Sequence, residues 1–373
     1  METAITRMLS IRYPIVAAPM FLVSGARLLL AVAEAGGIGI IPSLNFRTHQ
    51  AFREFLETFP QGVPFGVNLI LKDNPRLEED LLAVVERRVP LVVTSLGDPT
   101  PVVEKVKAYG GVVWCDVVGL RHGRKAVAAG ADALVAVASG AGGHAGQVSP
   151  FVLGPWLKAE LGVPVLIAGG IATGRQLLAA LALGDGAYIG TRFIATLESE
   201  APLEYKEALL RATPEDILYT PEVTGVPANF LRDSLERFRQ GGGKAWKEVY
   251  SAGHGVAFIR EIPSAKEVVA WLGEGEEAWV VLDRAGWHVS GRVEVPEGVR
   301  LVFLPPYSPE LQPVERVWPL VNEAVANRYF LRVLPHSSTP AILRSTRLRM
   351  RLWTKRIRLT RAARPQKDRA SIR

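Results

Sequence analysis

The sequence is short of cysteine. Cys115 is the only one in 373 residues, so an intrachain disulfide is impossible and a metal site built from several cysteine ligands is excluded. We expect no bound metal. The N-terminus also lacks a basic segment followed by a long apolar run, so we expect no secretory signal peptide.

A membrane-spanning helix is also not expected. Residues 133–157 contain no Asp, Glu, Lys or Arg and are numerous enough to cross a bilayer. The same run contains five glycines, two prolines and His144, and no lipid-facing helix would carry these residues together. We therefore interpret the protein as cytoplasmic.

Acidic residues are almost missing from the C-terminal tail. Residues 331–373 hold 13 Lys and Arg against one acid, Asp368, a net charge of +12. Since the whole chain carries +7, residues 1–330 carry −5. The high isoelectric point therefore reflects the tail. We do not expect functional nucleic-acid binding by it.

The first 200 residues are rich in short apolar, β-branched runs separated by helical patterns. The runs cover residues 15–18, 37–41, 65–71, 91–94, 112–118, 133–138, 165–168 and 187–190. The helical patterns cover residues 26–35, 77–88, 100–109, 121–129 and 173–183. This alternation is typical of a parallel sheet covered on its faces. Eight repeats predict a (β/α)8 TIM barrel, and an open doubly wound sheet is the alternative.

Polar or backbone-permissive residues stand where these runs end. They are Pro19-Met20, Pro42-Ser43, Asn68, Ser95, Asp116, Ser139, Gly169-Gly170 and Thr191. Barrel enzymes keep their chemistry at the carboxyl ends of their strands. The pattern therefore favours a barrel with a site at that mouth.

The stretch of residues 163–193 predicts an anion site. Gly169-Gly170 and Gly190-Thr191 follow the last two runs, where barrels commonly bind phosphate through backbone N–H groups. Thr173 suits a helix N-cap and Arg192 could add a cation. The alternative is that these are ordinary turn glycines.

The segment from Ser139 to Gln147 is a glycine-rich loop in which His144 alone projects. Gly142 and Gly143 would let the backbone lie against a planar ligand. His144 could then act as a general base or as a hydrogen-bond donor to substrate. The alternative is an exposed loop histidine.

A small helical addition is expected after the eighth run. We predict helices over residues 201–211, 228–240 and 266–272, and a cap at Thr213-Pro214-Glu215. A further segment, residues 246–260, places His254 in a second glycine-rich loop. His254 either faces solvent or lies over the pocket.

Five short motifs together carry a family resemblance. They are Ala17-Ala-Pro-Met20, Gly66-Val-Asn68, Gly140-Ala-Gly-Gly-His-Ala-Gly146, Ala168-Gly-Gly-Ile171 and Tyr188-Ile-Gly-Thr-Arg192. In this order, over residues 1 to about 272, the chain resembles the nitronate monooxygenase (2-nitropropane dioxygenase) family, whose relatives include flavin-dependent enoyl-acyl carrier protein reductases. Many members have Thr-Glu-Ala where this chain has Ser139-Gly-Ala141, and often glutamine in place of His254.

The resemblance implies an FMN cofactor, catalysis by His144 and oxidation of alkyl nitronates by O2 to a carbonyl compound and nitrite. NADH-dependent reduction of an enoyl thioester is the alternative, and the resemblance allows a homodimer. The implied cofactor-binding residues are Ala18, Pro19, Met20, Asn68, Asp116, Gly142, Gly143, Ala168, Gly169, Gly170, Gly190 and Thr191.

The chain changes character near residue 274. Trp279-Val-Val-Leu-Asp283 and the stretch of residues 304–318 resemble the end of a DDE transposase of the insertion-sequence type. Asp283 and Glu315 match two of its three metal-binding carboxylates, the first is missing, and Gln312 replaces the usual asparagine. A DNA-binding transposase remnant is thus a function of another class, which we expect to lack catalysis.

We therefore predict three parts. Residues 1–273 form an FMN-binding barrel, residues 274–330 a truncated transposase-like fragment, and residues 331–373 a basic, disordered tail. Our hypothesis is that an insertion element replaced the original C-terminus of a flavoprotein and left a chimaera. Mobile-element DNA beside the junction in the gene would support this origin, and its absence would refute it.

Overall fold

The computed structural model describes residues 2–241, 248–273, 278–282 and 299–303. The chain divides into two units, Met1–Gly275 and Glu276–Arg373. Each unit is described by itself.

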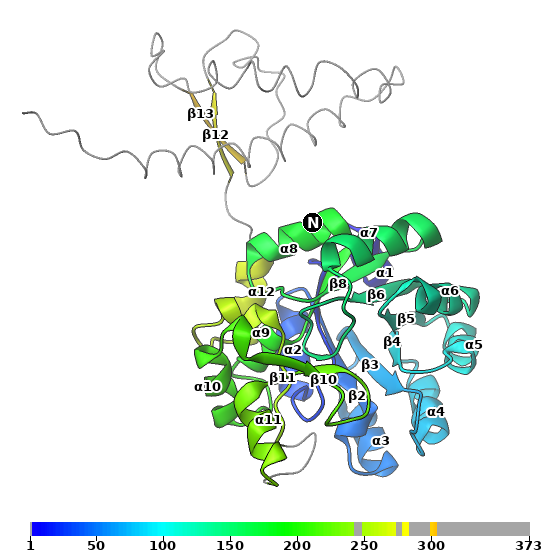
Figure 1. Cartoon of the computed structure of the whole chain (residues 1–373). Coiled ribbons are helices and arrows are strands. Elements are labelled where there is room, and N and C mark those ends of the chain that lie inside the picture. Colours follow the sequence, from blue (N-terminus) through cyan, green and yellow to red (C-terminus); the bar gives the residue numbers. More distant parts are fainter. Residues whose placement is uncertain (1, 242–247, 274–277, 283–298, 304–373) are drawn as a thin grey trace, which may run out of the picture. The chain divides into compact units, whose positions relative to one another are not determined.

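The first unit is built on a closed barrel of eight parallel strands (Figure 1). In barrel order they are β1 (Ile15–Ala17), β2 (Ile38–Pro42), β3 (Phe65–Ile70), β4 (Leu91–Ser95), β5 (Val112–Val117), β6 (Ala133–Val137), β8 (Val165–Ala168) and β9 (Gly186–Ile189). Closure comes from parallel pairing of β9 with β1. The predicted TIM barrel is confirmed, each run lies within one residue of its strand, and the open-sheet alternative is wrong.

Helices surround the barrel on its outside, as Figure 1 shows. They are α2 (Ala26–Glu34), α3 (His49–Thr58), α4 (Leu77–Arg87), α5 (Thr100–Ala108), α6 (Leu120–Ala128), α7 (Pro150–Leu161) and α8 (Gly174–Leu183). A late helix, α12 (Ala265–Gly273), packs against both α2 and α8 and so completes the ring. The five helices predicted between the strands are confirmed.

Continuous apolar runs form these strands because both of their faces are buried. Every residue of β2 and of β8 is buried. The inward-facing side chains, including Val16, Ile40, Leu91 and Leu166, form one interior cluster. Burial of these apolar side chains stabilises the barrel.

A short helix, α1 (Ala4–Leu9), fills the N-terminal end of the barrel. Ile5 is fully buried in the interior cluster. Trp114, on β5, donates from its indole Nε1 to the Met8 sulfur at 3.3 Å. The opposite mouth, at the carboxyl ends of the strands, is therefore the end that can receive a ligand.

The addition after β9 is not helical throughout. Its elements are α9 (Thr191–Ile194), α10 (Leu203–Arg211), a 3₁₀ turn η2 (Pro214–Asp216), β10 (Ile217–Thr220), β11 (Ala228–Leu231), α11 (Arg232–Arg239) and a 3₁₀ turn η3 (His254–Phe258). The helix predicted over residues 228–240 is wrong for its first four residues. They are all buried and form β11, which pairs antiparallel with β10 and with β7 (Gly143–His144). The sequence pattern of these four residues suggests a helix, but they are buried as a strand because they pair with β10 and β7.

The remaining predictions for the addition fare better. The cap at Thr213 is confirmed as a capping box with Asp216, and α12 confirms the closing helix. Helix α10 begins two residues later than predicted. Residues 246 and 247 lie outside the described residues.

In the second unit, β12 (Ala278–Leu282) pairs in parallel with β13 (Val299–Phe303). Asp283, Gln312 and Glu315 lie outside the described residues, and so does the whole basic tail.

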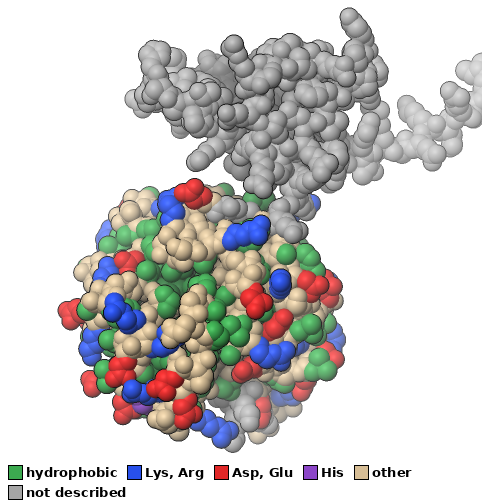
Figure 2. All heavy atoms as spheres, turned by 180° about the vertical axis from the view of Figure 1, so that it is seen from behind, with side chains coloured by type: hydrophobic (Ala, Val, Ile, Leu, Met, Phe, Trp, Pro, Cys, Tyr) green, Lys and Arg blue, Asp and Glu red, His purple; other side chains and the backbone are tan. Residues whose placement is uncertain are grey.

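The surface of the first unit carries charges of both signs. Figure 2 shows Lys and Arg interspersed with Asp and Glu on the face seen from behind. This mixing agrees with the small net charge of residues 1–330. No helix among the described residues is both long and apolar enough to span a bilayer.

Candidate active site

A chain of hydrogen bonds links the ends of three neighbouring strands at the barrel mouth. Asn68, on β3, donates from Nδ2 to the Ser95 hydroxyl on β4 at 2.9 Å and to the Val93 carbonyl at 3.1 Å. Ser95 donates in turn to Oδ2 of Asp116 on β5, at 2.6 Å. The predicted residues Asn68 and Asp116 thus belong to one polar strip, with Ser95 between them.

Two buried polar atoms near this strip lack a hydrogen-bond partner among the described residues. They are Oδ1 of Asp116 and the hydroxyl of Tyr188, whose residue is only 7% exposed. Burial raises the pKa of Asp116 to about 6, while the Ser95 hydrogen bond opposes the rise. Burial, and then the charge of Asp116, raise the pKa of Tyr188, so its hydroxyl stays a donor. Buried groups of this kind ordinarily find a partner, so they mark a place for a polar ligand edge.

The loop after β1 is held by two side chains that the sequence analysis did not single out. Ser24 accepts from the Met20 N–H at 3.0 Å. Asn45 accepts from the Leu22 N–H at 2.8 Å and donates to the carbonyls of Ser24 and Met20. Pro19 and Met20 are therefore fixed before any ligand arrives. Asn45 lies in the next loop, so no local pattern marked it.

The turns after β8 and β9 contain glycines with open space where a side chain would stand. Gly170 has φ +71°, and a Cβ built on it would meet nothing within 4 Å. A Cβ on Gly190 would meet no atom closer than 3.9 Å. The N–H groups of Gly170, Gly190 and Thr191 donate to no acceptor in the described part of the chain. Such a row of free donors suits an anion such as a phosphate.

Gly169 has a different task. Its φ is +129°, and a Cβ there would lie 2.8 Å from the Ser139 carbonyl oxygen. It therefore allows two strand-end loops to pack closely. At the start of α8, Thr173 and Gln176 form a capping box, as the N-cap prediction for Thr173 required.

Arg192 does not project as the free cation we considered. Its buried guanidinium donates from Nη2 to the carbonyls of Ala195 and Glu261, at 3.4 and 3.2 Å. Burial lowers its pKa, and the charge of Glu261 opposes this. The side chain therefore ties the segment after β9 to the segment before α12.

The segment around His144 is not the free loop that the sequence suggested. Gly143 pairs with Asn229 and His144 with Ala228, which places both in β7 beside β11. Asn229 also donates from Nδ2 to the Ala141 carbonyl at 2.6 Å. The β10–β11 hairpin therefore holds the histidine, and a pairing between residues so far apart in sequence leaves no local signal.

The ring of His144 contacts this hairpin directly. Its Nε2 lies 3.2 Å from the Thr224 hydroxyl oxygen. Burial lowers the pKa of His144, so the imidazole is neutral at neutral pH. A neutral imidazole carries a basic nitrogen and can serve as a general base.

The remaining predicted residues also lie at this mouth. Ala18 and Ala168 are buried in the interior cluster with Tyr188. A Cβ on Gly142 would lie 3.0 Å from the Gly253 N–H nitrogen, so the loop packs tightly there. His254 is exposed, and its N–H donates to the carbonyl of Gly140 on the same loop at 2.9 Å.

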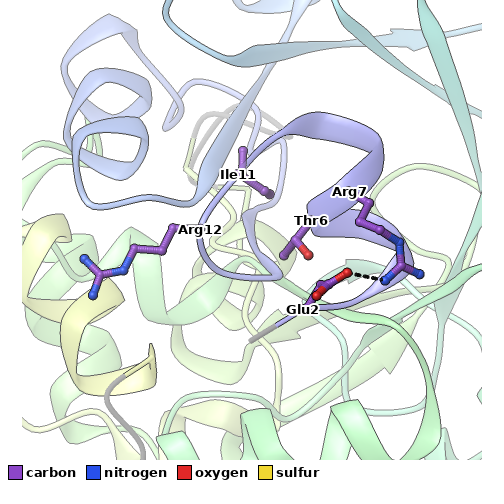
Figure 3. A pocket seen from close by; sticks show the side chains of 5 residues that line it. All are labelled: Glu2, Thr6, Arg7, Ile11 and Arg12. Atoms are coloured by element: carbon purple, nitrogen blue, oxygen red, sulfur yellow. Dashed lines mark hydrogen bonds and ion pairs between the residues drawn. The ribbon is translucent and has the colours of Figure 1, made fainter.

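A surface hollow of about 290 Å³ lies away from this mouth, beside α1 (Figure 3). Its lining residues are Glu2, Thr6, Arg7, Ile11 and Arg12. Arg7 points toward Glu2 and pairs with it at 3.0 Å. None of the predicted site residues lines this hollow.

Two family models match the chain. A model described as nitronate monooxygenase matches residues 2–81 and 76–240, which is more than half of the chain. A model described as DDE superfamily endonuclease matches residues 245–333. The second match overlaps η3 and α12, although the structure packs α12 against the barrel helices α2 and α8.

Individual relatives agree with the first match. A protein of Mycobacterium tuberculosis named (3aS,4S,5R,7aS)-5-hydroxy-7a-methyl-1-oxo-octahydro-1H-indene-4-carboxyl-CoA dehydrogenase is 32% identical over 250 residues, covering 66% of this chain and 70% of the relative. The structure of FabK from Thermotoga maritima matches with TM-score 0.67 and 32% identity, over 73% of this chain and 95% of that one. Nitroalkane oxidase from Streptomyces ansochromogenes matches with TM-score 0.63 and 27% identity, over 72% and 96% of the two chains.

Proposed function

The chain belongs to the nitronate monooxygenase family and is a flavin-dependent oxidoreductase, and on this premise we propose that it binds FMN and oxidises alkyl nitronates with O2. The products would be a carbonyl compound and nitrite. The observation that carries the proposal is the gathering of free N–H groups, unpartnered polar atoms and His144 at one barrel mouth.

The residues at the mouth fit FMN. The N–H groups of Gly170, Gly190 and Thr191 would hold its phosphate, because they have no acceptor among the described residues and the side-chain positions of both glycines are open. Asp116 and Tyr188 offer an acceptor and a donor for the polar edge of a ring system. Other proposed cofactor contacts are Ala18, Pro19, Met20, Asn68, Gly142, Gly143, Ala168 and Gly169. When bound, the flavin would take electrons from the substrate and pass them to O2.

The protein's own part is positioning and proton transfer. The Met20 loop is locked by Ser24 and Asn45, so it would present a fixed surface to the ring. His144 would either take the α-proton of a neutral nitroalkane, which leaves the nitronate that is then oxidised, or donate a hydrogen bond to the substrate. Gly143 and Gly170 leave room at the mouth, since a Cβ on either would meet nothing within 4 Å.

Reduction of an enoyl thioester with NADH is the second candidate. One relative is named a carboxyl-CoA dehydrogenase, and its 32% identity spans 66% of this chain and 70% of its own length. This similarity supports a thioester substrate. No described residue identifies a nicotinamide site or a surface for an acyl carrier.

One pair of experiments tests both candidates. The purified full-length protein should be yellow, and mixing it with a nitronate without O2 should bleach the flavin absorption band. Bleaching by NADH and not by nitronate would favour the thioester reductase. A colourless protein that cannot be reconstituted with FMN would refute both.

The role of His144 is tested by its replacement. His144→Ala should lower kcat/KM for the neutral nitroalkane by roughly 10²- to 10⁴-fold, the usual contribution of a general acid or base. FMN should remain bound. His122→Ala, on the exposed face of α6, is the matched control and should leave turnover unchanged. Equal turnover in both variants would exclude His144 as the catalytic residue.

A further inference from the structure

We propose that Thr224 is a positioning residue that holds the imidazole proton of His144 on Nε2 and so makes Nδ1 the basic nitrogen. The inference rests on the proposed function for the catalytic role of His144. The proposal itself states which ring nitrogen of His144 carries the proton, and this can be measured without any turnover.

Thr224 reaches His144 through the β10–β11 hairpin. It lies in the connection between the two strands, 80 residues from His144 in sequence. Pairing of β11 with β7 brings the connection and the histidine together, and the Thr224 hydroxyl oxygen lies 3.2 Å from Nε2. Tyr219, on β10, donates to the Ala145 carbonyl at 2.9 Å and holds the hairpin against the next residue of the same segment.

The single proton of the Thr224 hydroxyl is already used. The hydroxyl donates to the Val226 carbonyl at 2.9 Å and accepts from the Val226 N–H at 3.2 Å. A hydroxyl has one donor and two acceptor lone pairs. The second lone pair can therefore only accept a hydrogen bond, and Nε2 of His144 must be the donor. This arrangement satisfies the hydroxyl completely.

The hydroxyl is held in this orientation by the turn around it. The N–H groups of Thr224 and Gly225 both donate to the Pro221 carbonyl, at 3.2 and 2.7 Å. Gly225 has φ +74°, a backbone conformation that glycine adopts without strain. Threonine is also stiff at χ1, because its Cβ is branched.

A neutral imidazole with its proton on Nε2 has its basic lone pair on Nδ1. The hydrogen bond made by one ring nitrogen sets the state of the other. Burial lowers the pKa of His144, which keeps the ring in this neutral form. His144 would then accept a proton at Nδ1, so the structure favours the base role over the donor role.

The test compares Thr224→Val with Thr224→Ser. Valine keeps the branched shape and removes the hydroxyl, whereas serine keeps the hydroxyl. The readout is ¹⁵N NMR of histidine-labelled full-length protein, with and without FMN, in which His144→Gln identifies the His144 signals. Wild type and Thr224→Ser should show the proton on Nε2, and Thr224→Val should show a mixture of the two tautomers.

Activity gives a second readout. Loss of one hydrogen bond of about 1 kcal/mol should reduce kcat/KM of Thr224→Val for the neutral nitroalkane by roughly fivefold, with recovery in Thr224→Ser. Tyr219→Phe is the structural control, because it removes another anchor of the hairpin and keeps the Thr224 hydroxyl. It should keep the proton on Nε2.

Two outcomes would overturn the proposal. One is a proton on Nδ1 in the wild-type protein, which decides the matter even if every variant fails to fold. The other is the same tautomer in Thr224→Val as in wild type. Absence of nitronate turnover would instead count against the proposed function, and the tautomer measurement would still stand.

Discussion

The Ser95 hydroxyl donates to Oδ2 of Asp116 across 2.6 Å, and it supports a carboxyl whose other oxygen is buried without a partner among the described residues. Burial and this hydrogen bond act in opposite directions on the pKa of Asp116, and burial is the larger effect. The carboxyl therefore titrates between mildly acidic and neutral pH, where a cofactor or substrate would sense its charge.

Asp116→Asn should change how stability depends on pH. The native pKa of about 6 lies above the ordinary 3.8, so the folded protein holds this proton more tightly than the unfolded chain. Its stabilising effect is complete below pH 3.8 and is lost as pH rises toward 6, at a cost of about 3 kcal/mol. Asparagine has no such titration. Urea unfolding of the flavin-free protein should be measured from about pH 3 to about pH 8, a range that spans both pKa values. The variant should show a shallower decline in stability, and parallel curves would contradict the argument.

With a neutral nitroalkane as substrate, the acid limb of kcat/KM should lie below pH 6.5. Burial lowers the pKa of His144 from that ordinary value, and the base is active only when neutral. Activity should therefore be constant above the limb and fall as His144 becomes protonated. His122→Ala should keep the limb. A limb above pH 6.5 would show that another group, or a charged His144, controls the reaction.

Gly170→Ala should weaken FMN binding more than it weakens the fold. The new Cβ would enter open space beside the proposed phosphate site, at a residue with φ +71°. Left-handed backbone costs a non-glycine residue about 1–2 kcal/mol. Gly162→Ala, at the C-terminal cap of α7, has φ +67° and equal open space, so it is the matched control.

Both glycine variants should lose similar stability in thermal unfolding of the flavin-free protein. Only Gly170→Ala should lose affinity in a titration with FMN, followed by quenching of the flavin fluorescence. Equal affinities in the two variants would remove Gly170 from the proposed phosphate site.

Asp80→Ala should be strongly destabilising. The Asp80 side chain is 0% exposed and contacts Nδ1 of His49 at 3.1 Å and Nη2 of Arg76 at 3.4 Å. Removing it leaves the Arg76 guanidinium largely buried without its counter-ion, a loss of about 3–5 kcal/mol. Glu57→Ala breaks an exposed pair with Arg53 and should cost less than about 1 kcal/mol. Chemical denaturation of both variants would measure the difference, and similar losses would refute it.

The barrel could be predicted from the sequence because its signals are local. A buried parallel strand such as β8 needs a continuous apolar run, and the residue that ends it marks the mouth. Asn68, Asp116 and the paired glycines were found in this way, without knowledge of any contact between them.

The support around His144 could not be predicted because it depends on pairing between distant segments. Strand β7 has two residues, too few for any periodic pattern, and it exists only because β11 lies beside it. Thr224 and Asn229 take their roles from the register of that pairing. Asn45 likewise donates to the Ser24 carbonyl in the loop after β1, and no local sequence pattern reveals a contact between residues so far apart.

Helix α12 fills the last gap in the wall between α2 and α8, and it ends at Gly273. All eight barrel strands and the helices around them are complete at that residue. Translation that continues into inserted coding sequence would therefore add residues without removing any part of the barrel. A gene broken at this point can therefore acquire a new ending while its older enzyme keeps its shape, which would explain how two unrelated ancestries came to share one polypeptide.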